Sequence, residues 1–474
     1  MREIFLLVLT SVLVIKILRK PIFGLYCAVF FLPFGKWALI NIGNSGFLYI
    51  YFIVAVTFFS ELIKKITYNE KIPNMFIYVS YLLILIFFLY MVFSIVLSYK
   101  MPYASYRGEL PFTRSIKQIV LFSFAMLFYF QIIYYVNNSE VLNKIFKFYT
   151  ASLIFLTFIC FIEFLDFYFT NPVTTFIFNF WHNSKSGSGI FDLFAPAGLQ
   201  RGVFPRLRGL ESEPSILGMY LVLSFYFILL IKQTYGEKYL RKLKYLPYAL
   251  VIALMFTFSR SAQMIFAFGI LILFALRHRK LKIKMVRLIM FCFLVILVIP
   301  FLISPLRQSI FEITKLKGTD ESKMTRYINL MTSVNVFKNN WLFGVGIGNF
   351  GFYYSDNLYR ETDTLPHEVS SMLSPDSTGW PVTNNMITRI LVELGVVGFL
   401  LFMFFQFYIW TVALRILRNK QWKTFGVYYL VIFLLILAFY FTNESFQFFV
   451  YWFFPGIIVA TYNVLKHERL KNTV

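Results

Sequence analysis

Residues that bind metal ions or form disulfides are scarce in this sequence, which has three cysteines and four histidines among its 474 residues. Cys27, Cys160 and Cys292 all lie inside apolar runs, where a free thiol usually packs as a small apolar side chain. The sequence contains no cluster of cysteines and histidines, no HExxH motif and no GxSxG motif. We therefore expect no disulfide, no metal and no cofactor, and these absences argue against metalloenzyme and serine hydrolase functions.

Charged residues are also few, at 14% of the chain, whereas 59% of the residues are hydrophobic and 21% are aromatic. One soluble surface cannot enclose that much apolar material, and apolar runs of membrane-crossing length recur along the whole chain. The sequence therefore predicts an all-α, polytopic membrane protein, a transmembrane bundle of about 12–14 helices with one large external loop.

Thirteen apolar runs are the expected spans. They cover residues 4–17, 21–40, 47–63, 75–97, 116–136, 145–169, 216–231, 246–258, 262–276, 286–303, 387–409, 425–441 and 446–464. The eighth run is shorter than the roughly 17 residues that a straight helix needs, so it is expected to be re-entrant, or tilted and buried in protein.

Lysine and arginine outnumber aspartate and glutamate by 45 to 22, which gives a net charge of +23. In a soluble protein this excess would suggest nucleic acid, but here the basic residues cluster in short loops between apolar runs, as cytoplasmic loops do. Four basic segments, at 238–245, 277–287, 415–423 and 466–474, are expected to face the cytoplasm. Alternation then places residues 201–215 and 304–386 outside, and the membrane replaces nucleic acid as the expected partner.

These features divide the chain into four regions. N-terminal transmembrane helices occupy 1–200, central transmembrane helices with a basic external motif occupy 201–303, a large external loop occupies 304–386, and C-terminal transmembrane helices occupy 387–474. The external loop has seven basic and eight acidic residues, and near-neutrality in a chain of +23 supports its placement outside. A loop of this length is more often functional than merely connecting.

The stretch "RLRGLESEPSILGMYL", residues 206–221, gathers charges just ahead of an apolar run. Pro214 can open a helix there, and the free N–H groups of a helix start favour anions. Arg206 and Arg208 lie just upstream, with forked donors that suit phosphate oxygens. A lipid phosphate at the outer leaflet would fit; alternatively, both arginines reach lipid head groups while Glu213 pairs with one of them.

Two more arginines are candidates for the same site. Arg260, in "FTFSRSAQ", lies between two apolar runs, so it is either a turn residue at the outer surface or a second cation for the phosphate. Arg326 precedes apolar residues at helical spacing across 328–337, which predicts an amphipathic helix over the membrane core. Glycines alternate at 344, 346 and 348, which permits close backbone approach or positive φ but is weak evidence for a phosphate cradle.

Acidic residues and one histidine complete the candidates. His367 in the long loop could act as a general base only with an orienting partner such as Asp363 or Glu368. Glu163 and Asp166 lie three residues apart in the sixth run, and we expect them to face the bundle interior and pair with a cation or hydrogen-bond a sugar.

Four patches resemble the O-antigen polymerase and O-antigen ligase superfamily of bacterial envelope glycosyltransferases. They are "RGLESEPS" (208–215), "FSRSA" (258–262), "RYINLMTSVNVFKNNWLFGVGIGNF" (326–350) and "NNMITRILVELGVVG" (384–398). The resemblance implies a GT-C-like membrane glycosyltransferase of O-antigen and lipopolysaccharide biosynthesis. Such an enzyme transfers a growing glycan from undecaprenyl-pyrophosphate to the next lipid-linked repeat unit, on the periplasmic face of the bacterial inner (plasma) membrane. A separate chain-length regulator stays open as a further partner.

The resemblance also implies roles for particular residues. Arg208, Arg260 and Arg326 match the arginines that hold the pyrophosphate, and Glu213 matches the acid of the "EPS" pattern often seen in polymerases; we predict these four as catalytic residues. Five further residues are predicted to bind the substrate: Arg206, Glu211, His367, Asn384 and Asn385.

One departure from the family pattern bears on the reaction. Ligases typically carry a catalytic histidine followed by asparagine where this chain has Asn384 and Asn385, and an asparagine cannot act as a general base. This difference favours a polymerase. It leaves the base open between Glu213, Glu211 and His367.

Three other functions compete with this prediction. A ligase would transfer the glycan to a lipid A core acceptor. A lipid-linked sugar flippase or another transporter would line a central cavity with charges from several spans, whereas most cations here lie in loops. A wall polymerase of the shape and division type shares the many spans and the long outer loop, but its patches do not occur here.

Overall fold

Long apolar helices dominate the structure, a computed structural model of the chain. It describes residues 2–35, 38–42, 45–68, 79–99, 106, 108–169, 206–211, 213–240, 244–277, 321–360, 365–374 and 380–471. The elements in chain order are α1 (Arg2–Arg19), α2 (Pro21–Phe30), β1 (Ala38–Ile42), β2 (Ser45–Leu48), α3 (Tyr49–Tyr68), α4 (Val79–Tyr99), α5 (Pro111–Tyr135), α6 (Ser139–Phe169), α8 (Pro214–Leu240), α9 (Leu246–Phe256), α10 (Arg260–Arg277), α13 (Glu321–Asn339), α14 (Phe350–Tyr353), α15 (His367–Leu373), α16 (Met386–Arg418), α17 (Lys423–Phe439) and α18 (Val450–Lys471).

Six of the described helices are long and apolar enough to cross a membrane. The qualifying segments are Val79–Leu97, Pro111–Tyr135, Ser139–Leu165, Pro214–Thr234, Arg260–Arg277 and Met386–Arg418, with shorter apolar helices at Pro21–Phe30, Leu246–Phe256 and Lys423–Phe439. The hydrocarbon core of a membrane offers no hydrogen-bond partners, and a helix satisfies its backbone N–H and C=O groups internally. The prediction of an all-α, multi-pass membrane protein is confirmed; the run at 286–303 lies outside the described residues.

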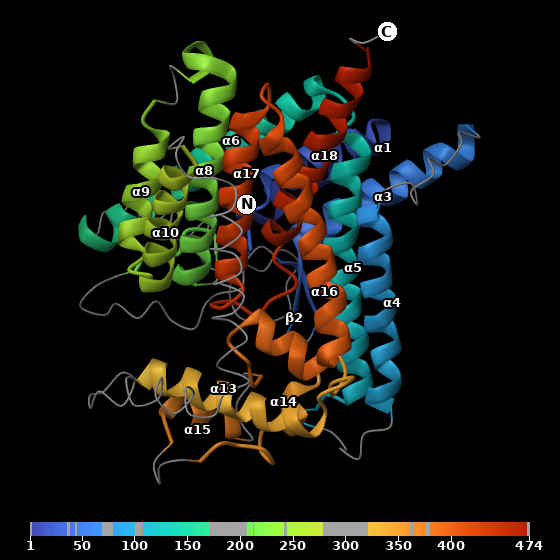
Figure 1. Cartoon of the computed structure of the whole chain (residues 1–474), viewed down its shortest axis with the longest axis vertical. Helices are drawn as coiled ribbons and strands as arrows, with labels where there is room; N and C mark the ends of the chain where they lie inside the picture. The colour runs from blue at the N-terminus through green and yellow to red at the C-terminus, as the bar shows by residue number, and fades with distance from the viewer. Residues whose placement is uncertain are drawn as a thin grey trace.

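The helices form a bundle with a separate layer across one end (Figure 1). Helix α16 packs against α17 and α4, α18 packs against α5, and α8 packs against α17 and α9. Aromatic rings fill the centre: Tyr149 of α6 stacks on Phe453 of α18 with ring centroids 5.2 Å apart. Such contacts account for much of the high aromatic content, because ring pairs add stabilisation beyond the area they bury.

The predicted second span, 21–40, is wrong in its second half. Helix α2 ends at Phe30, and β1 then pairs antiparallel with β2, with Ile40 opposite Phe47 and Ile42 opposite Ser45. Pro33 follows shortly after the helix end, and a proline lacks the N–H that a continuing helix needs. Apolar composition alone therefore could not separate a hairpin from the continuation of a helix.

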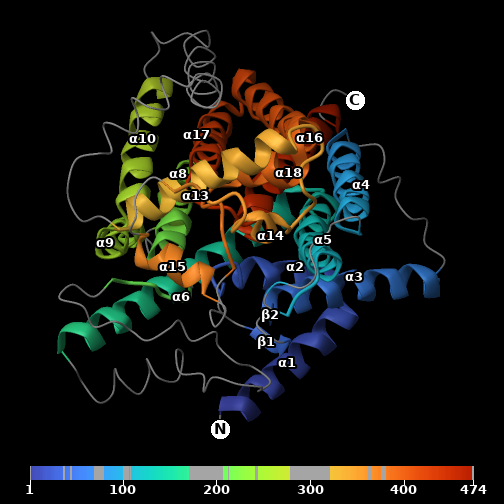
Figure 2. The ribbon, with the colours of Figure 1, turned by 90° about the horizontal axis from the view of Figure 1, so that it is seen from below.

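The amphipathic helix predicted after Arg326 is confirmed as α13. Ile328 and Val336 are buried, whereas Arg326 is exposed. Helix α13 packs against α16 and α15, and it lies across the end of the bundle with α14 and α15 (Figure 2). This layer forms a cap on one end of the transmembrane helices.

Helix α16 is broken at Gly395, where φ is 67° and ψ is −171°. The break leaves backbone groups of α16 without their helical partners. The segment with glycines at 344, 346 and 348 forms hydrogen bonds with them. The N–H groups of Val345 and Gly346 donate to the carbonyls of Val392 and Glu393 at 3.0 and 2.8 Å. A broken helix is tolerated in a membrane protein when other groups satisfy its backbone, so the glycine segment supports α16.

Candidate functional site

The charged stretch that precedes α8 is anchored by a buried carboxylate. Glu163 of α6 accepts the backbone N–H of Arg208 at 3.1 Å and that of Gly209 at 2.7 Å. The N–H of Leu207 donates to Phe256 at the end of α9, 3.0 Å away. Glu163 therefore faces the bundle interior as predicted, and its carboxylate accepts hydrogen bonds from backbone amides of this stretch. The side chain of Asp166 lies outside the described residues.

The four predicted arginines come from three separate chain segments, and the charges of the other three act on Arg206. Arg206 donates to the carbonyls of Thr257 at 3.0 Å and Phe258 at 3.3 Å, so its guanidinium lies against the turn before α10 even though the residue is exposed overall. Burial lowers the pKa of the Arg206 guanidinium.

Neighbouring charges act on the same group. Arg208 lowers the pKa of Arg206 and Glu213 raises it, while Arg260 and Arg326 lower it further. We call Arg206, Arg208, Arg260 and Arg326 the arginine cluster. Several guanidinium groups around Arg206 suit an anion with more than one charge, because each can donate a charge-assisted hydrogen bond to its oxygens.

The two glutamates of the stretch lie in different surroundings. Glu213 is exposed, accepts a hydrogen bond from the hydroxyl of Ser215 at 3.0 Å, and acts on the charge of Arg206. Glu211 is only 4% exposed and lines a cavity in the bundle. A β-carbon added at Gly35 would lie 2.1 Å from its Oε2, so the carboxylate lies against the segment after α2. Ser212, between the two glutamates, lies outside the described residues.

Two adjoining cavities lie in the bundle, and Glu211 of this stretch lines the larger one. The larger, of about 300 Å³, has apolar walls from the segment after α2, from α3, α5 and α8, and from the segment that leads into α18. Its polar lining includes Lys117, Glu211 and Ser445. The smaller, of about 200 Å³, is lined by residues that include Trp380, Thr383, Arg389, Glu393 and Glu444. Four residues line both cavities: Arg114, Gln118, Ser445 and Gln447. The larger cavity reaches the lower end of the range of small-molecule sites, roughly 300–1,000 Å³.

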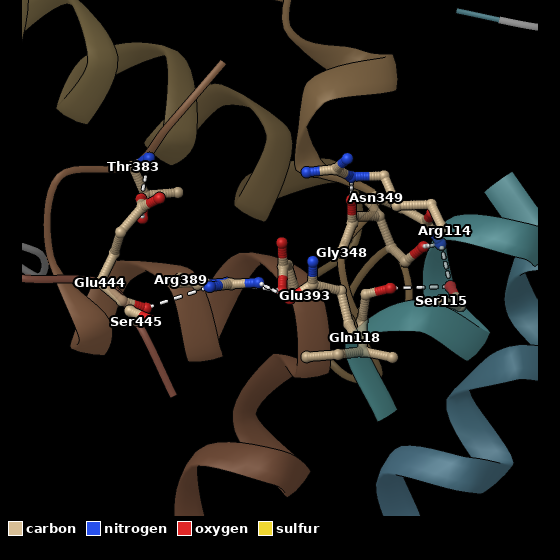
Figure 3. Close-up of polar contacts among 12 residues, drawn as sticks. Arg114, Ser115, Gln118, Gly348, Asn349, Thr383, Arg389, Glu393, Glu444 and Ser445 are labelled. Atoms are coloured by element: carbon tan, nitrogen blue, oxygen red, sulfur yellow. Dashed lines mark hydrogen bonds and ion pairs between the residues drawn. The ribbon is translucent and has the colours of Figure 1, made fainter. Parts of the chain in front are cut away.

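A buried arginine joins three segments at the smaller cavity (Figure 3). Arg389 pairs with Glu393 through Nε and Oε2, 3.0 Å apart. Its Nη1 donates to the carbonyl of Glu444 at 3.1 Å, and its Nη2 donates to Oε1 of Gln118 at 3.0 Å. Gln447 donates to the same Gln118 oxygen at 3.2 Å. Sequence analysis missed this network, although two charges four residues apart within an apolar run were a signal for it.

A second basic residue on the cavity wall is equally occupied. Arg114 pairs with Glu109 at 2.7 Å, donates to the carbonyl of Gly348 at 2.9 Å, and lies 3.4 Å from the ring centre of Trp380. Lys117 also pairs with Glu109, at 3.0 Å. Burial raises the pKa of Glu109, but its hydrogen bonds and ion pairs with the two basic residues outweigh burial, so the pKa lies below its usual value.

Asn384 and Asn385 form the turn that starts α16. The side chain of Asn385 caps the helix, accepting the N–H of Thr388 at 2.6 Å. Asn384 has a positive φ of 62°, and Oε2 of Glu444 accepts the N–H groups of Thr383 and Asn384 at 2.6 and 3.0 Å. Both asparagines thus have structural contacts, and their predicted contact with substrate stays a prediction.

His367 begins α15 and is exposed, as is Glu368 beside it. No hydrogen bond of its imidazole occurs among the described residues, and its other candidate partner, Asp363, lies outside them. Within the same ranges, no group of three or more histidines, cysteines, aspartates or glutamates could hold a metal ion. Cys27 and Cys160 are buried free thiols, and Cys292 lies beyond the described ranges.

One family model matches the chain, at residues 245–403, and its description is O-Antigen ligase. The matched segment is about a third of the sequence and contains three of the four patches, those at 258–262, 326–350 and 384–398. No curated protein matches the chain. The match supports the O-antigen polymerase and ligase superfamily that the sequence patches resemble, and with it an enzyme of the general O-antigen ligase or polymerase type.

Proposed function

We propose that this protein is a polysaccharide polymerase that transfers a growing glycan from undecaprenyl-pyrophosphate to the next lipid-linked repeat unit on the outer face of the plasma membrane. The arginine cluster carries the proposal. Arg206 hydrogen-bonds the turn before Arg260, and the charges of the other three arginines act on it, so the cluster offers four cations to a pyrophosphate leaving group. The family match supports lipid-linked glycan chemistry in general. The proposed placement outside the membrane rests on the positive-inside rule.

In the proposed reaction, an acceptor hydroxyl oxygen attacks the anomeric carbon of the donor sugar. The bond between that carbon and the pyrophosphate oxygen breaks, and the pyrophosphate keeps the electron pair. Fixed arginines stabilise the negative charge that develops on it, and contacts of this kind are commonly worth about a hundredfold or more in rate. The hydroxyl proton passes to a carboxylate base and then to water.

Glu211 is the base that the geometry favours among Glu213, Glu211 and His367. It lines the larger cavity, whereas Glu213 is exposed beside Arg206 and His367 is exposed on the outer layer. The backbone connects the two sites directly, because Arg208 and Glu211 belong to one turn, with the N–H of Glu211 donating to the carbonyl of Arg208 at 3.0 Å. A base for the acceptor hydroxyl and cations for the leaving group of the donor can therefore serve one transfer reaction.

The ligase remains the second candidate, since the matching family model is described as O-Antigen ligase. The two reactions share the donor and differ in the acceptor. Purified protein given one lipid-linked repeat unit, without metal or nucleotide, should build a ladder of lipid-linked oligomers. A ligase would leave the substrate as a single unit until a lipid A core acceptor is added, and a flippase would leave it chemically unchanged in both cases.

Within that assay, Arg208→Ala and Arg326→Ala should each reduce elongation by about a hundredfold or more, with near-normal expression. Lysine at either position should restore little, because it lacks the forked donor geometry. Arg418→Ala is the matched control, an exposed arginine at the far end of α16. Normal ladders from both alanine variants would contradict the assignment of the arginine cluster.

Glu211→Gln and Glu213→Gln separate the two carboxylates. Glutamine keeps the shape but cannot accept the proton, so Glu211→Gln should slow elongation while the lipid-linked donor still binds. Glu213→Gln should have the smaller effect. The reverse order of effects would move the base role to Glu213.

A further inference from the structure

The smaller cavity presents hydrogen-bonding groups that the proposed reaction does not use. Glu393 binds Arg389 through Oε2, and Glu444 binds the turn before α16 through Oε2. Oε1 of each carboxylate has no partner among the described residues. In the same part of the chain, the amide nitrogen of Gln118 and the amide oxygen of Gln447 also have none. The lining thus offers three acceptors and one amide donor.

Cations that could bind an anion there are already occupied. Arg389 has three partners, and Arg114 and Lys117 share Glu109. The charged groups that line the two cavities balance, since three are basic and three are acidic: Arg114, Lys117, Arg389, Glu211, Glu393 and Glu444. A second phosphate or an acidic sugar would meet free carboxylate oxygens without a free cation to offset them.

We propose that the smaller cavity is a saccharide subsite that binds a neutral, hydroxyl-rich sugar of the acceptor repeat unit. Sugar hydroxyls would donate to the free oxygens of Glu393, Glu444 and Gln447, and a ring or hydroxyl oxygen would accept from Gln118. The larger cavity continues from it through four shared residues and contains Glu211, so a hydroxyl of the bound sugar can reach the proposed base. This inference rests on the proposed function.

Hydrogen-bonding groups that recognise hydroxyls make the site selective. A site built for a hydroxyl strongly rejects an analogue that lacks it, because the protein groups are then left unpaired in a low-dielectric pocket. Gln118 and Gln447 are the specificity-determining residues in this arrangement. They come from α5 and from the segment just before α18, so the subsite depends on the packing of α5 against α18.

Wild-type protein provides the first test, by saturation-transfer difference NMR in detergent with methyl glycosides as probes. The neutral probes are the methyl glycosides of glucose, galactose and N-acetylglucosamine, and methyl glucuronide is the acidic one. At least one neutral probe should bind saturably. Methyl glucuronide should bind at least about tenfold more weakly than that probe. In a deoxy series of the binding probe, loss of one hydroxyl should weaken binding by about tenfold or more. Absent binding, or preference for the glucuronide, would overturn the proposal.

Variants then test whether the glycoside binds in the smaller cavity. Gln118→Met and Gln447→Met keep side-chain length and remove the hydrogen-bonding groups, so each should weaken binding of the neutral probe about tenfold or more. Gln421→Met is the matched control, an exposed glutamine at the other end of α16 and expected to bind normally. Unchanged binding in both cavity variants would place the sugar elsewhere and reject the subsite.

The subsite and the proposed function can fail separately. Arg208→Ala should reduce elongation by about a hundredfold or more and leave glycoside binding within about twofold of wild type, because the arginine cluster holds the pyrophosphate and not the acceptor sugar. Glycoside binding without a ladder from wild-type protein would keep the subsite and reject the polymerase. A ladder without glycoside binding would keep the polymerase and reject the subsite.

Discussion

A methyl group added at Gly395 tests whether the break in α16 fixes the cavity. With φ of 67° and ψ of −171°, Gly395 occupies a backbone region that is essentially restricted to glycine. A β-carbon there would lie 2.2 Å from the carbonyl oxygen of Leu342 and 2.6 Å from the backbone nitrogen of Phe343. Both are backbone atoms of the segment that supports the break, so neither can rotate away as a side chain would.

The cost follows from two terms. The strained backbone costs about 1–3 kcal/mol, and overpacking against backbone typically costs about 1–3 kcal/mol more. The sum is a large fraction of the roughly 5–15 kcal/mol by which proteins are usually stable. We therefore expect Gly395→Ala to lower the thermal unfolding temperature clearly. It should also weaken elongation, because Arg389 and Glu393 lie on the short part of α16 before the break.

Gly108→Ala is the matched control for this experiment. Gly108 has a similar φ of 72°, but a β-carbon there would meet no atom within 4 Å. The Gly108→Ala variant should therefore lose only the stability that backbone strain costs. Thermal unfolding in detergent, monitored by intrinsic fluorescence, should show a much smaller drop in unfolding temperature than for Gly395→Ala. Equal unfolding temperatures for the two variants, with wild-type ladders from Gly395→Ala, would refute the reasoning that the break is rigid.

Three further carboxylates give separate predictions. The pKa of Glu109 is lower in the folded protein, so its ion pairs stabilise the fold at pH values above the unfolded pKa of about 4.3. This stabilisation is lost as pH falls through the lower folded pKa. Glu109→Gln should therefore flatten the dependence of unfolding on pH in that acid range. Glu163→Gln should cost about 1.5–3 kcal/mol in thermal unfolding and reduce elongation, because it disturbs the backbone that positions Arg208. Glu444→Ala should lower the unfolding temperature more than Glu368→Ala, an exposed control, because it leaves the turn at Asn384 without its acceptor.

The helices could be predicted because the membrane leaves few alternatives. A long apolar run must satisfy its backbone internally, so its length and composition nearly decide the structure. The second run shows the limit, since hairpin residues such as Ile40 and Phe47 are as apolar as those of a helix. The amphipathic helix α13 could be predicted from periodicity, because one of its faces packs and the other carries Arg326.

The arginine cluster could be anticipated, and the buried network could not. Arg206 and Arg260 lie between apolar runs, and Arg326 precedes apolar residues at helical spacing. Charges are conspicuous at such places, and the positive-inside rule predicts the side of the membrane on which they lie. Gln118 and Gln447 meet although they are 329 residues apart, and an uncharged amide in a long chain gives no signal of its partner. Contacts of this kind depend on how α5 and α18 pack, which composition does not specify.

The glycine segment and the start of α16 are two halves of one structural unit, and this bears on what the family match can mean. The patches at 326–350 and 384–398 meet where Gly346 donates to Glu393, and both lie inside the matched range of 245–403. The match therefore covers the scaffold that supports the break, together with Arg260 and Arg326 of the proposed donor site. Gln118 and Gln447, the proposed acceptor contacts, lie outside that range. If the reactions of a polymerase and a ligase differ in their acceptors, the residues that distinguish them in this chain should be sought in α5 and before α18, where the family model does not reach.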